Sequence, residues 1–300
     1  MSRAVPFLIT EADTELVRKL VVEQFPQYAT LPVEYRATGW DNVMFALGNE
    51  LAVRLPRRPE AFTPQRNEFD WLNKATAPLT TSVPHVVHVA RPSELFEHAW
   101  AIVEWMEGIR SMSVVPSQRD ACAASLGTQL ALLHQPAPAG APSNPYRGIP
   151  LGLRAPIVNQ RIATTPALQP VLPVWETALS ATPYELEQVW CHGDLHPGNY
   201  LLTSEGELAG IIDFGDITSG DPAVDLSTAW LSFTSVGRSE FFAAYLSACD
   251  PFIAADGGLL ARAQGWAIST FISSVLTSEL STPDFVETSH WAMSELLSHA

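Results

Sequence analysis

The sequence predicts an α+β fold in two lobes, a small lobe built on an antiparallel sheet over residues 1–105 and a larger, mainly helical lobe over residues 106–300. Short apolar segments joined by glycine-containing turns dominate the first third of the chain, and this pattern is typical of strands in hairpins. Apolar residues at helical spacing dominate the remainder. With 47% hydrophobic and 16% charged residues among 300, the chain can bury a core in each lobe.

The small lobe is predicted to begin with a helix over residues 11–25, where Thr10 and Asp13 suit a capping box and apolar residues recur at helical spacing. Three strands follow, joined by turns that contain Gly39 and Gly48. A helix beginning at Pro64 then precedes two more strands. The predicted strands are residues 33–37, 43–47, 51–55, 85–90 and 100–105, and the second helix is residues 64–75.

The larger lobe is predicted to contain mostly helices, together with a few short strands. Residues 136–156 include six prolines and are predicted to form an irregular loop. Apolar periodicity predicts helices over residues 117–134, 223–233, 240–248, 259–279 and from 284 onward. Short strands are predicted over residues 189–191, 200–203 and 208–212.

The chain is strongly acidic, with a formal net charge of −15. An acidic surface repels nucleic acid and anionic lipid and favours cationic ligands, although acidity also serves solubility alone. We therefore expect no nucleic-acid or membrane partner, and no apolar run is long enough to span a bilayer. The first residues do not resemble a signal peptide, and three widely spaced cysteines, Cys122, Cys191 and Cys249, suit a reducing environment. A cytoplasmic location is expected.

The run from His192 to Asn199, His-Gly-Asp-Leu-His-Pro-Gly-Asn, carries the strongest chemical signal in the sequence. Asp194 follows the first histidine by two positions and precedes Asn199 by five, which is the spacing of a kinase catalytic loop. Asp213 opens an Asp-Phe-Gly run at the end of an apolar strand, where a carboxylate is paired, caps a turn or holds a metal. Together the two runs indicate phosphoryl transfer. We interpret His196, within the loop, as a packing residue.

These motifs resemble those of the bacterial aminoglycoside phosphotransferase family, which includes macrolide phosphotransferases. The resemblance covers most of the chain and is supported by weaker motifs at residues 39–42, 52–57, 68, 104–108 and 220–225. It implies a bilobal protein-kinase-like fold, in which residues 1–105 bind the nucleotide and residues 106–300 form the catalytic and substrate lobe. It also implies that Asp194 is the catalytic base, that Asn199 and Asp213 bind Mg²⁺, and that Asp225 bonds back to the catalytic loop.

The nucleotide, ATP or GTP, is expected to contact the small lobe. Kinases place a phosphate-binding lysine on the third strand, but that strand holds Arg54 instead, so we expect Arg54 to serve with Glu68 as its partner. The alternative is an exposed strand arginine. The turn that contains Asp41 and Asn42 is expected to approach the phosphates through its backbone N–H groups. The backbone of Glu104 to Met106 is expected to bind the purine.

The expected acceptor is a hydroxyl of a cationic small molecule, most simply an aminoglycoside-type amino sugar, because the protein is so acidic. A macrolide or a small amino alcohol is the alternative, since the helical lobe is rich in Trp and Leu. The acidic and aromatic candidates for binding it are Asp216, Asp221, Glu240, Asp284, Glu287, Trp230, Phe233, Trp266 and Trp291.

Two other functions are disfavoured by the same motifs. A non-catalytic nucleotide-binding pseudokinase would not need Asp194, Asn199 and Asp213 together. A protein kinase would need a long activation loop after its Asp-Phe-Gly motif, and here only a few residues separate Gly215 from Asp221.

Overall fold

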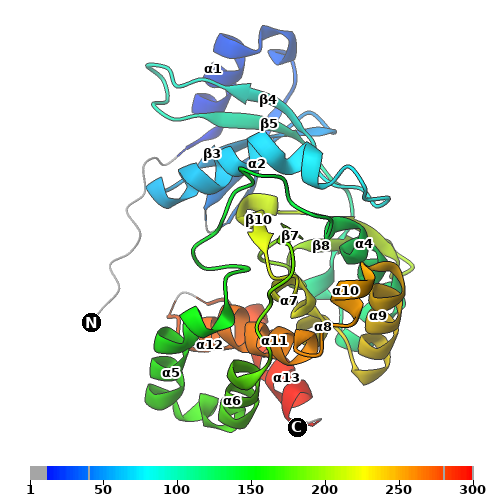
Figure 1. Ribbon diagram of the computed structural model, residues 1–300. Helices are drawn as coiled ribbons and strands as arrows, with labels where there is room; N and C mark the ends of the chain where they lie inside the picture. Colours follow the sequence, from blue (N-terminus) through cyan, green and yellow to red (C-terminus); the bar gives the residue numbers. More distant parts are fainter. Residues whose placement is uncertain (1–11, 40, 280, 299–300) are drawn as a thin grey trace. The chain divides into compact units, whose positions relative to one another are not determined.

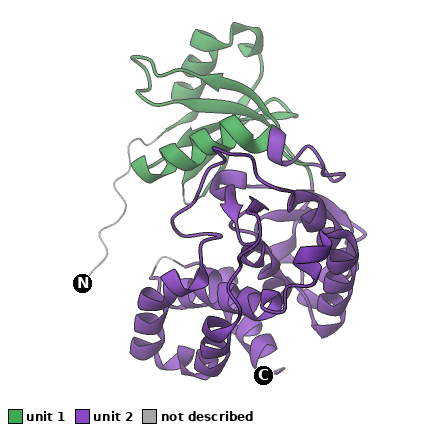
Figure 2. Cartoon of the chain, viewed as in Figure 1, with its two compact units in different colours: residues 1–73, 83–107 green, residues 74–82, 108–300 purple. Residues whose placement is uncertain are grey.

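Five antiparallel strands form the sheet of the first of two units in the computed structural model, which describes residues 12–39, 41–279 and 281–298 (Figure 1). Unit 1 consists of Met1–Asn73 and Val83–Glu107, and unit 2 consists of Lys74–Ser82 and Gly108–Ala300 (Figure 2). The antiparallel sheet near the N-terminus and the helical remainder confirm the predicted α+β class. None of the described helices is both long and apolar enough to cross a membrane.

The sheet of unit 1 has the strand order β1-β2-β3-β5-β4, and each neighbouring pair is antiparallel. Its strands are β1 (Val33–Thr38), β2 (Asn42–Leu47), β3 (Leu51–Pro56), β4 (Val86–Ala90) and β5 (Trp100–Glu104). Its helices are α1 (Thr14–Gln24) and α2 (Phe62–Ala75), with short 3-10 turns η1 (Pro26–Tyr28) and η2 (Pro59–Ala61). All five predicted strands and both predicted helices are present, with ends shifted by a few residues.

Alternation along β3 sends successive side chains to opposite faces of this sheet. Val53 belongs to the core cluster that includes Leu20 of α1. Ala52 belongs to a second cluster, against which Phe69 of α2 packs. Since Arg54 is two residues from Ala52, its side chain leaves the sheet on the α2 face. The strand period therefore directs this arginine toward α2.

Helix α1 begins three residues later than expected because Asp13 is itself the N-cap. The Asp13 carboxylate accepts a hydrogen bond from the backbone N–H of Leu16 at 2.8 Å. An aspartate in this position satisfies one of the free N–H groups of the first helical turn. Thr10 and Glu11, which the prediction placed at the helix start, lie outside the described residues.

Unit 2 contains two small antiparallel sheets among its helices. One pairs β7 (Val189–Cys191) with β10 (Thr218–Gly220), and the other has the order β6 (Ile109–Arg110), β8 (Tyr200–Leu202) and β9 (Leu208–Ile211). The helices are α3 (Pro116–Arg119), α4 (Ala123–Leu133), α5 (Ala155–Thr164), α6 (Leu172–Ser180), α7 (Ala223–Leu226), α8 (Thr228–Ser232), α9 (Ser235–Ala248), α10 (Pro251–Ala254), α11 (Leu259–Trp266), α12 (Ser273–Leu276) and α13 (Pro283–Leu297). The 3-10 turns are η3 (Ser111–Ser113), η4 (Asp120–Cys122), η5 (Leu151–Arg154), η6 (Pro166–Val171) and η7 (Phe214–Asp216).

Several predicted boundaries in unit 2 were wrong. The predicted proline-rich loop ends earlier, because η5 begins at Leu151 and α5 at Ala155, with Pro156 in the first helical turn, where a proline is tolerated. Strands β6 and β10 were not predicted, because two or three residues are too few to show the alternation of apolar and polar side chains that indicates a strand. The predicted helix over residues 117–134 is divided into α3, η4 and α4.

The helix predicted over residues 259–279 is interrupted by a π-helical segment, η8 (Ala267–Ile272). Hydroxyl groups in this region bond to backbone carbonyls of the preceding turn. Thr270 Oγ1 donates to the carbonyl of Trp266 at 2.8 Å, and Ser274 Oγ donates to that of Ser269 at 3.2 Å. Such bonds compete with the regular helical ladder and accompany its local widening.

Candidate active site

The candidate catalytic loop, residues 192–199, lies between β7 and β8, and the buried carboxylate of Asp225 forms hydrogen bonds to its backbone. Asp225 of α7 is fully buried, and its Oδ2 and Oδ1 accept hydrogen bonds from the backbone N–H groups of His192 at 2.7 Å and Gly193 at 2.8 Å. Gly193 has a φ of 87°, and a Cβ there would lie 2.3 Å from the carbonyl oxygen of Asp216. The expected bond from Asp225 back to the loop is therefore confirmed.

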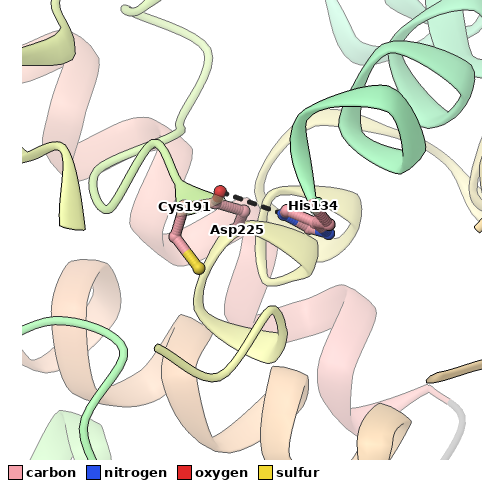
Figure 3. Close-up of side chains that lie close together, drawn as sticks. All are labelled: His134, Cys191 and Asp225. Atoms are coloured by element: carbon pink, nitrogen blue, oxygen red, sulfur yellow. Dashed lines mark hydrogen bonds and ion pairs between the residues drawn. The ribbon is translucent and has the colours of Figure 1, made fainter. Parts of the chain in front are cut away.

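A second layer of contacts supports Asp225 (Figure 3). His134 Nε2 lies 3.2 Å from Asp225 Oδ2, and its Nδ1 lies 2.8 Å from the hydroxyl of Tyr245. His134, Cys191 and Asp225 each place a possible metal-ligand atom within 4.8 Å of the others. Both Asp225 oxygens are already used by loop N–H groups, so this cluster is a hydrogen-bonded support for the loop.

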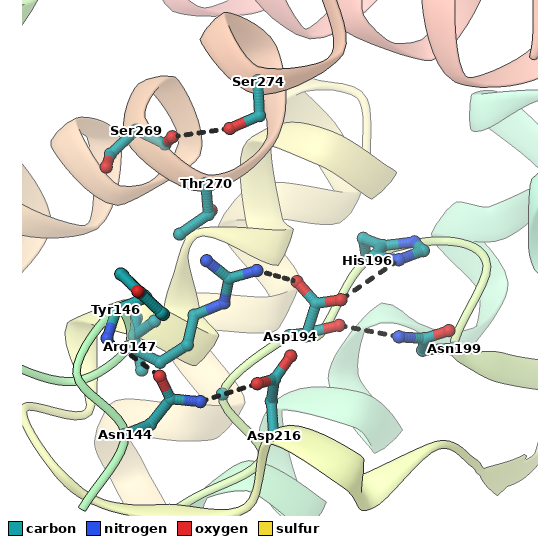
Figure 4. Close-up of polar contacts among 12 residues, drawn as sticks. Asn144, Tyr146, Arg147, Asp194, His196, Asn199, Asp216, Ser269, Thr270 and Ser274 are labelled. Atoms are coloured by element: carbon teal, nitrogen blue, oxygen red, sulfur yellow. Dashed lines mark hydrogen bonds and ion pairs between the residues drawn. The ribbon is translucent and has the colours of Figure 1, made fainter. Parts of the chain in front are cut away.

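Asp194 presents a carboxylate with 33% of its side chain exposed (Figure 4). Arg147 Nη2 donates to its Oδ1 at 3.1 Å, and His196 Nε2 lies 3.8 Å from its Oδ2. Burial, the largest single influence, would raise the pKa of the Asp194 carboxyl, but the charge and hydrogen bond of Arg147, together with His196 and His192, outweigh burial and leave that pKa below its ordinary value. Asp194 is therefore ionised at neutral pH.

His196 is a packing residue, as the sequence indicated. Its ring lies 5.2 Å from that of Phe271 and 5.3 Å from that of Phe285. Burial lowers the pKa of His196 to about 4, so the imidazole is neutral near pH 7. Its Nδ1 accepts a hydrogen bond from the backbone N–H of Gly198 at 2.9 Å, so Nε2 carries the ring hydrogen, on the side of Asp194.

Asn199 and Asp213 are brought together by the hairpin of β8 and β9. The backbone N–H of Ile212 donates to the carbonyl of Asn199 at 2.9 Å, which sets Asn199 beside the residue that precedes Asp213. The Nδ2 of Asn199 donates to the backbone carbonyl of Asp194 at 2.8 Å, so its Oδ1 is the atom left to bind a ligand. Asp213 has φ 65° and ψ 64°, and it is the single non-glycine residue with a positive φ within the described ranges. Such strain concentrates at functional sites.

Arg147 is the site residue that sequence reasoning missed. It lies in the proline-rich loop before η5, and that loop is attached to the neighbourhood of the catalytic loop. Asn144 Nδ2 donates to Asp216 Oδ1 at 2.6 Å, and the carbonyl of Gly148 accepts from the N–H of Asp221 at 2.8 Å. An arginine in a chain with few cations was a weak signal, and nothing in the spacing indicated its partner.

In unit 1, Arg54 and Glu68 form the expected pair. Arg54 Nη1 donates to Glu68 Oε1 at 2.9 Å, and Arg54 Nη2 lies 2.8 Å from Glu68 Oε2, a bidentate arrangement. Both residues are buried, and the guanidinium also lies 5.7 Å from the ring centre of Phe69. The alternative of an exposed strand arginine was therefore wrong.

The turn before β2 places its two candidate residues differently. The Asp41 carboxylate is paired with Arg58, and the backbone carbonyl of Asp41 accepts from the N–H of Arg57 at 2.8 Å. Asn42 begins β2, and its Oδ1 is buried without a hydrogen-bond partner in the described part of the chain. An unpaired buried oxygen is costly, so Asn42 is the better placed of the two for a polar ligand.

Glu104 ends β5, and Met106 lies just beyond it. The N–H of Glu104 donates to the carbonyl of His85 at 3.0 Å, and that of Trp105 donates to the carbonyl of Glu50 at 2.8 Å. These two N–H groups are used within unit 1. A purine bound by this segment would have to use other backbone groups, such as those of Met106.

Four of the nine residues named as candidates for binding the acceptor serve the fold instead. Asp221 is buried and its Oδ2 lies 2.7 Å from Nε of Arg262. Trp230, Phe233 and Trp266 are buried in the core. Asp216 is the acidic candidate that lies beside the loop carrying Arg147, through its bond to Asn144. Glu240, Asp284 and Glu287 are exposed and Trp291 is partly exposed.

The model of the phosphotransferase enzyme family matches residues 33–259 of the chain, well over half of its length. The chain belongs to this family. The match agrees with the resemblance seen in the two catalytic motifs, and it identifies the chain as a phosphotransferase. Among curated proteins, none matches this phosphotransferase.

Solved structures with a similar fold carry related names. The GDP complex of wild-type aminoglycoside 2'-phosphotransferase-IIIa superposes with a TM-score of 0.69 at 17% identity, covering 96% of this chain and 99% of that chain. The streptomycin–ATP complex of APH(2'')-IIa gives 0.58 at 18% identity, covering 97% of each chain. Apo macrolide 2'-phosphotransferase MphH from Brachybacterium faecium gives 0.62 at 19% identity, covering 88% and 90%. At these identities the likeness shows the fold.

Proposed function

We propose that this phosphotransferase transfers the γ-phosphoryl group of ATP or GTP to a hydroxyl of a small molecule, with Asp194 as the catalytic base. The observation that carries this proposal is the partly exposed Asp194 carboxylate, on a loop that is bonded to Asp225 and whose backbone carbonyl at Asp194 accepts from the Asn199 amide. An ionised carboxylate can orient the acceptor hydroxyl and accept its proton.

The proposed transfer requires the acceptor hydroxyl, the nucleoside triphosphate and the Asp194 carboxylate. The acceptor oxygen bonds to the γ-phosphorus, the bond from that phosphorus to the bridging oxygen breaks, and the electron pair leaves with the nucleoside diphosphate. The hydroxyl proton passes to the Asp194 carboxylate and then to solvent. Because such transfers have a loose transition state, positioning and charge matter more than strong basicity, so the low pKa of Asp194 suits its role.

Asn199 and Asp213 would hold Mg²⁺. Their fit rests on the donor set, since an amide oxygen and a carboxylate are the hard oxygen ligands that Mg²⁺ prefers. Because Asn199 Nδ2 donates to the carbonyl of Asp194, the amide oxygen is the atom that we propose for binding the cation. When bound, Mg²⁺ neutralises charge on the nucleotide phosphates.

For the nucleotide, we propose that Arg54 contacts the phosphates while Glu68 holds its guanidinium in place. A bidentate carboxylate fixes the plane of the guanidinium, so less side-chain entropy is lost when phosphate oxygens bind. Asn42 and the backbone near Met106 are the further candidates for nucleotide contacts. Similar folds were solved as GDP and ATP complexes, which supports a nucleoside triphosphate as the donor.

For the acceptor, we propose a cationic small molecule of the aminoglycoside type, in keeping with the net charge of −15 and with the names of similar folds. A macrolide is the second candidate, and one observation favours it. Tyr146 is 61% exposed and immediately precedes Arg147, whose side chain bonds to Asp194, so the loop that reaches the candidate base also carries an exposed aromatic ring.

The test is a panel of aminoglycosides, macrolides and small amino alcohols, each assayed with ATP and GTP for phosphate transfer. Asp194→Asn is the matched control, because it keeps the shape of the side chain and removes its charge. We expect one acceptor class to be phosphorylated by the wild type and turnover to fall by about 100-fold or more in the variant. Nucleotide binding without transfer to any acceptor would support the pseudokinase alternative instead.

A further inference from the structure

The guanidinium of Arg147 has more hydrogen-bond donors than its described partners use. It carries five N–H groups. One nitrogen, Nη2, donates to Asp194 Oδ1 at 3.1 Å, and 18% of the side chain is exposed. Its Nε is buried and has no hydrogen-bond partner among the residues that the structure describes. A buried N–H on a cation that has no protein partner leaves hydrogen-bonding capacity for an oxygen atom from outside the described chain, from water or from a ligand.

The loop that carries Arg147 is docked at several points. The N–H of Asn144 donates to Oγ1 of Thr218 in β10 at 2.8 Å, and the N–H of Ser219 donates to the carbonyl of Pro142 at 2.8 Å. A Cβ on Gly220 would lie 2.3 Å from the carbonyl oxygen of Gly148, so the two backbones touch. Arg147 is thus positioned by its loop as well as by its bond to Asp194.

Arg147 approaches Asp194 from the side opposite Asn199, and its free end lies toward Thr270 (Figure 4). If Asn199 is a metal ligand, the face of Asp194 that bears Arg147 is the face left for the acceptor. Burial and then the charge of Arg147 lower the pKa of Arg154, so these two arginines lie close enough to interact. Arg147 therefore lies between carboxylates, Asp194 and Asp216, and a second guanidinium, that of Arg154.

From these contacts we infer that Arg147 is a catalytic residue on the acceptor side. It orients the Asp194 carboxylate with one N–H and binds, with the others, an oxygen atom of the acceptor at or beside the reacting hydroxyl. This inference rests on the proposed function of Asp194. It also restricts where the acceptor can carry a positive charge, because a guanidinium repels a nearby ammonium group. Any amino group of the acceptor then lies away from the reacting hydroxyl.

Two rival roles for Arg147 predict different outcomes. In a purely structural role, Arg147 would stabilise the loop without affecting the reaction once the protein is folded. In an inhibitory role, Arg147 would block access to Asp194 until it is displaced, so removing its side chain would speed the reaction. Hydrolysis of the nucleoside triphosphate distinguishes all three roles without a known acceptor, since water then supplies the oxygen that Asp194 and Arg147 hold.

The experiment compares steady-state hydrolysis of ATP and GTP by the wild type, Arg147→Lys and Arg147→Met. Arg161→Met is the control, because Arg161 is also partly buried in unit 2 but bonds to Ser274 Oγ at 2.7 Å, away from Asp194. Thermal midpoints of all variants report folding. We expect Arg147→Met to lower kcat by about 10- to 100-fold with an unchanged KM for nucleotide, and Arg147→Lys to lie between it and the wild type. Guanidinium added to Arg147→Ala should restore part of the lost rate.

Each other result overturns the inference in a recognisable way. Hydrolysis by Arg147→Met at the wild-type rate would show that the role of Arg147 is purely structural, and faster hydrolysis would show that it is inhibitory. A raised KM for nucleotide with normal kcat would place it on the nucleotide instead. If the folded wild type binds nucleotide but neither hydrolyses it nor transfers phosphate to any acceptor in the panel, the proposed function fails, and the inference fails with it.

Discussion

The side-chain amide of Asn199 donates to the backbone carbonyl of Asp194 at 2.8 Å, which ties the candidate metal ligand to the candidate base. Asn199→Asp keeps an oxygen at this position but replaces the donor with a carboxylate that faces a carbonyl oxygen. We expect the rate of phosphate transfer or hydrolysis to fall by about tenfold or more. The Mg²⁺ concentration for half-maximal rate should change as well, because the side chain must turn. Unchanged Mg²⁺ dependence would contradict the assignment.

The substitution Asp213→Asn tests whether Asp213 binds the metal without disturbing the left-handed backbone at this position. Asparagine tolerates a left-handed backbone better than most residues, so the fold should survive at the φ of 65°. We expect affinity for nucleotide to fall about tenfold when Mg²⁺ is present and to stay unchanged in EDTA. Calorimetry under both conditions measures this. Equal losses with and without Mg²⁺ would point to a folding defect, and no loss would remove the metal assignment.

Asp225→Ala should destabilise the protein strongly, because it leaves the buried N–H groups of His192 and Gly193 without an acceptor. Unsatisfied buried groups of this kind cost about 1–3 kcal/mol each, so we expect a loss on the order of 3 kcal/mol in the free energy of unfolding. Denaturant titration provides the measurement. Asp70→Ala, which removes an exposed carboxylate of α2, is the control and should have little effect. A similar stability for both variants would contradict the stabilising role of the hydrogen bonds between Asp225 and the loop.

Glu68→Gln removes the charge that holds Arg54 while keeping the size of the side chain. Since Arg54 Nη1 donates to one Glu68 oxygen and Nη2 forms an ion pair with the other, the guanidinium should lose its fixed orientation. We expect KM for nucleotide to rise by about tenfold with a smaller change in kcat, and Arg54→Met to have the larger effect on KM. Arg66→Met, on the exposed side of α2, is the control. Normal KM in all three variants would show that this pair does not serve the nucleotide.

The thiol of Cys122 should make stability depend on alkaline pH. Burial raises the pKa of Cys122 to about 12, whereas a thiol in the unfolded chain has an ordinary value near 9. Between these values the folded protein binds more protons than the unfolded chain, so the free energy of unfolding falls as pH rises from about 9 toward 12. At pH 10 the free energy of unfolding lost in this way is about 1–2 kcal/mol. Cys122→Ala should show a shallower decline in denaturant titrations from pH 8 to 10, and equal slopes would contradict this account.

Residues close together along the chain, or related by a regular strand period, could be assigned from the sequence. The loop that contains Asp194 and Asn199 is one continuous run, and a single hairpin brings Asp213 beside it. Arg54 faces Glu68 because alternation along β3 directs it to the face covered by α2. Local geometry sets these relationships, so motif and periodicity were sufficient to find them.

Contacts between distant segments needed the folded chain. Arg147 meets Asp194 across 47 positions, through a loop whose own sequence does not specify where it docks. Asp221 looked available to a ligand, but Arg262, 41 positions away, neutralises it in the interior. Sequence patterns record which face of an element is apolar, whereas the pairing of charges depends on how several elements pack against one another. For this reason the reaction type could be predicted from the sequence, while the cation beside the candidate base was visible only in three dimensions.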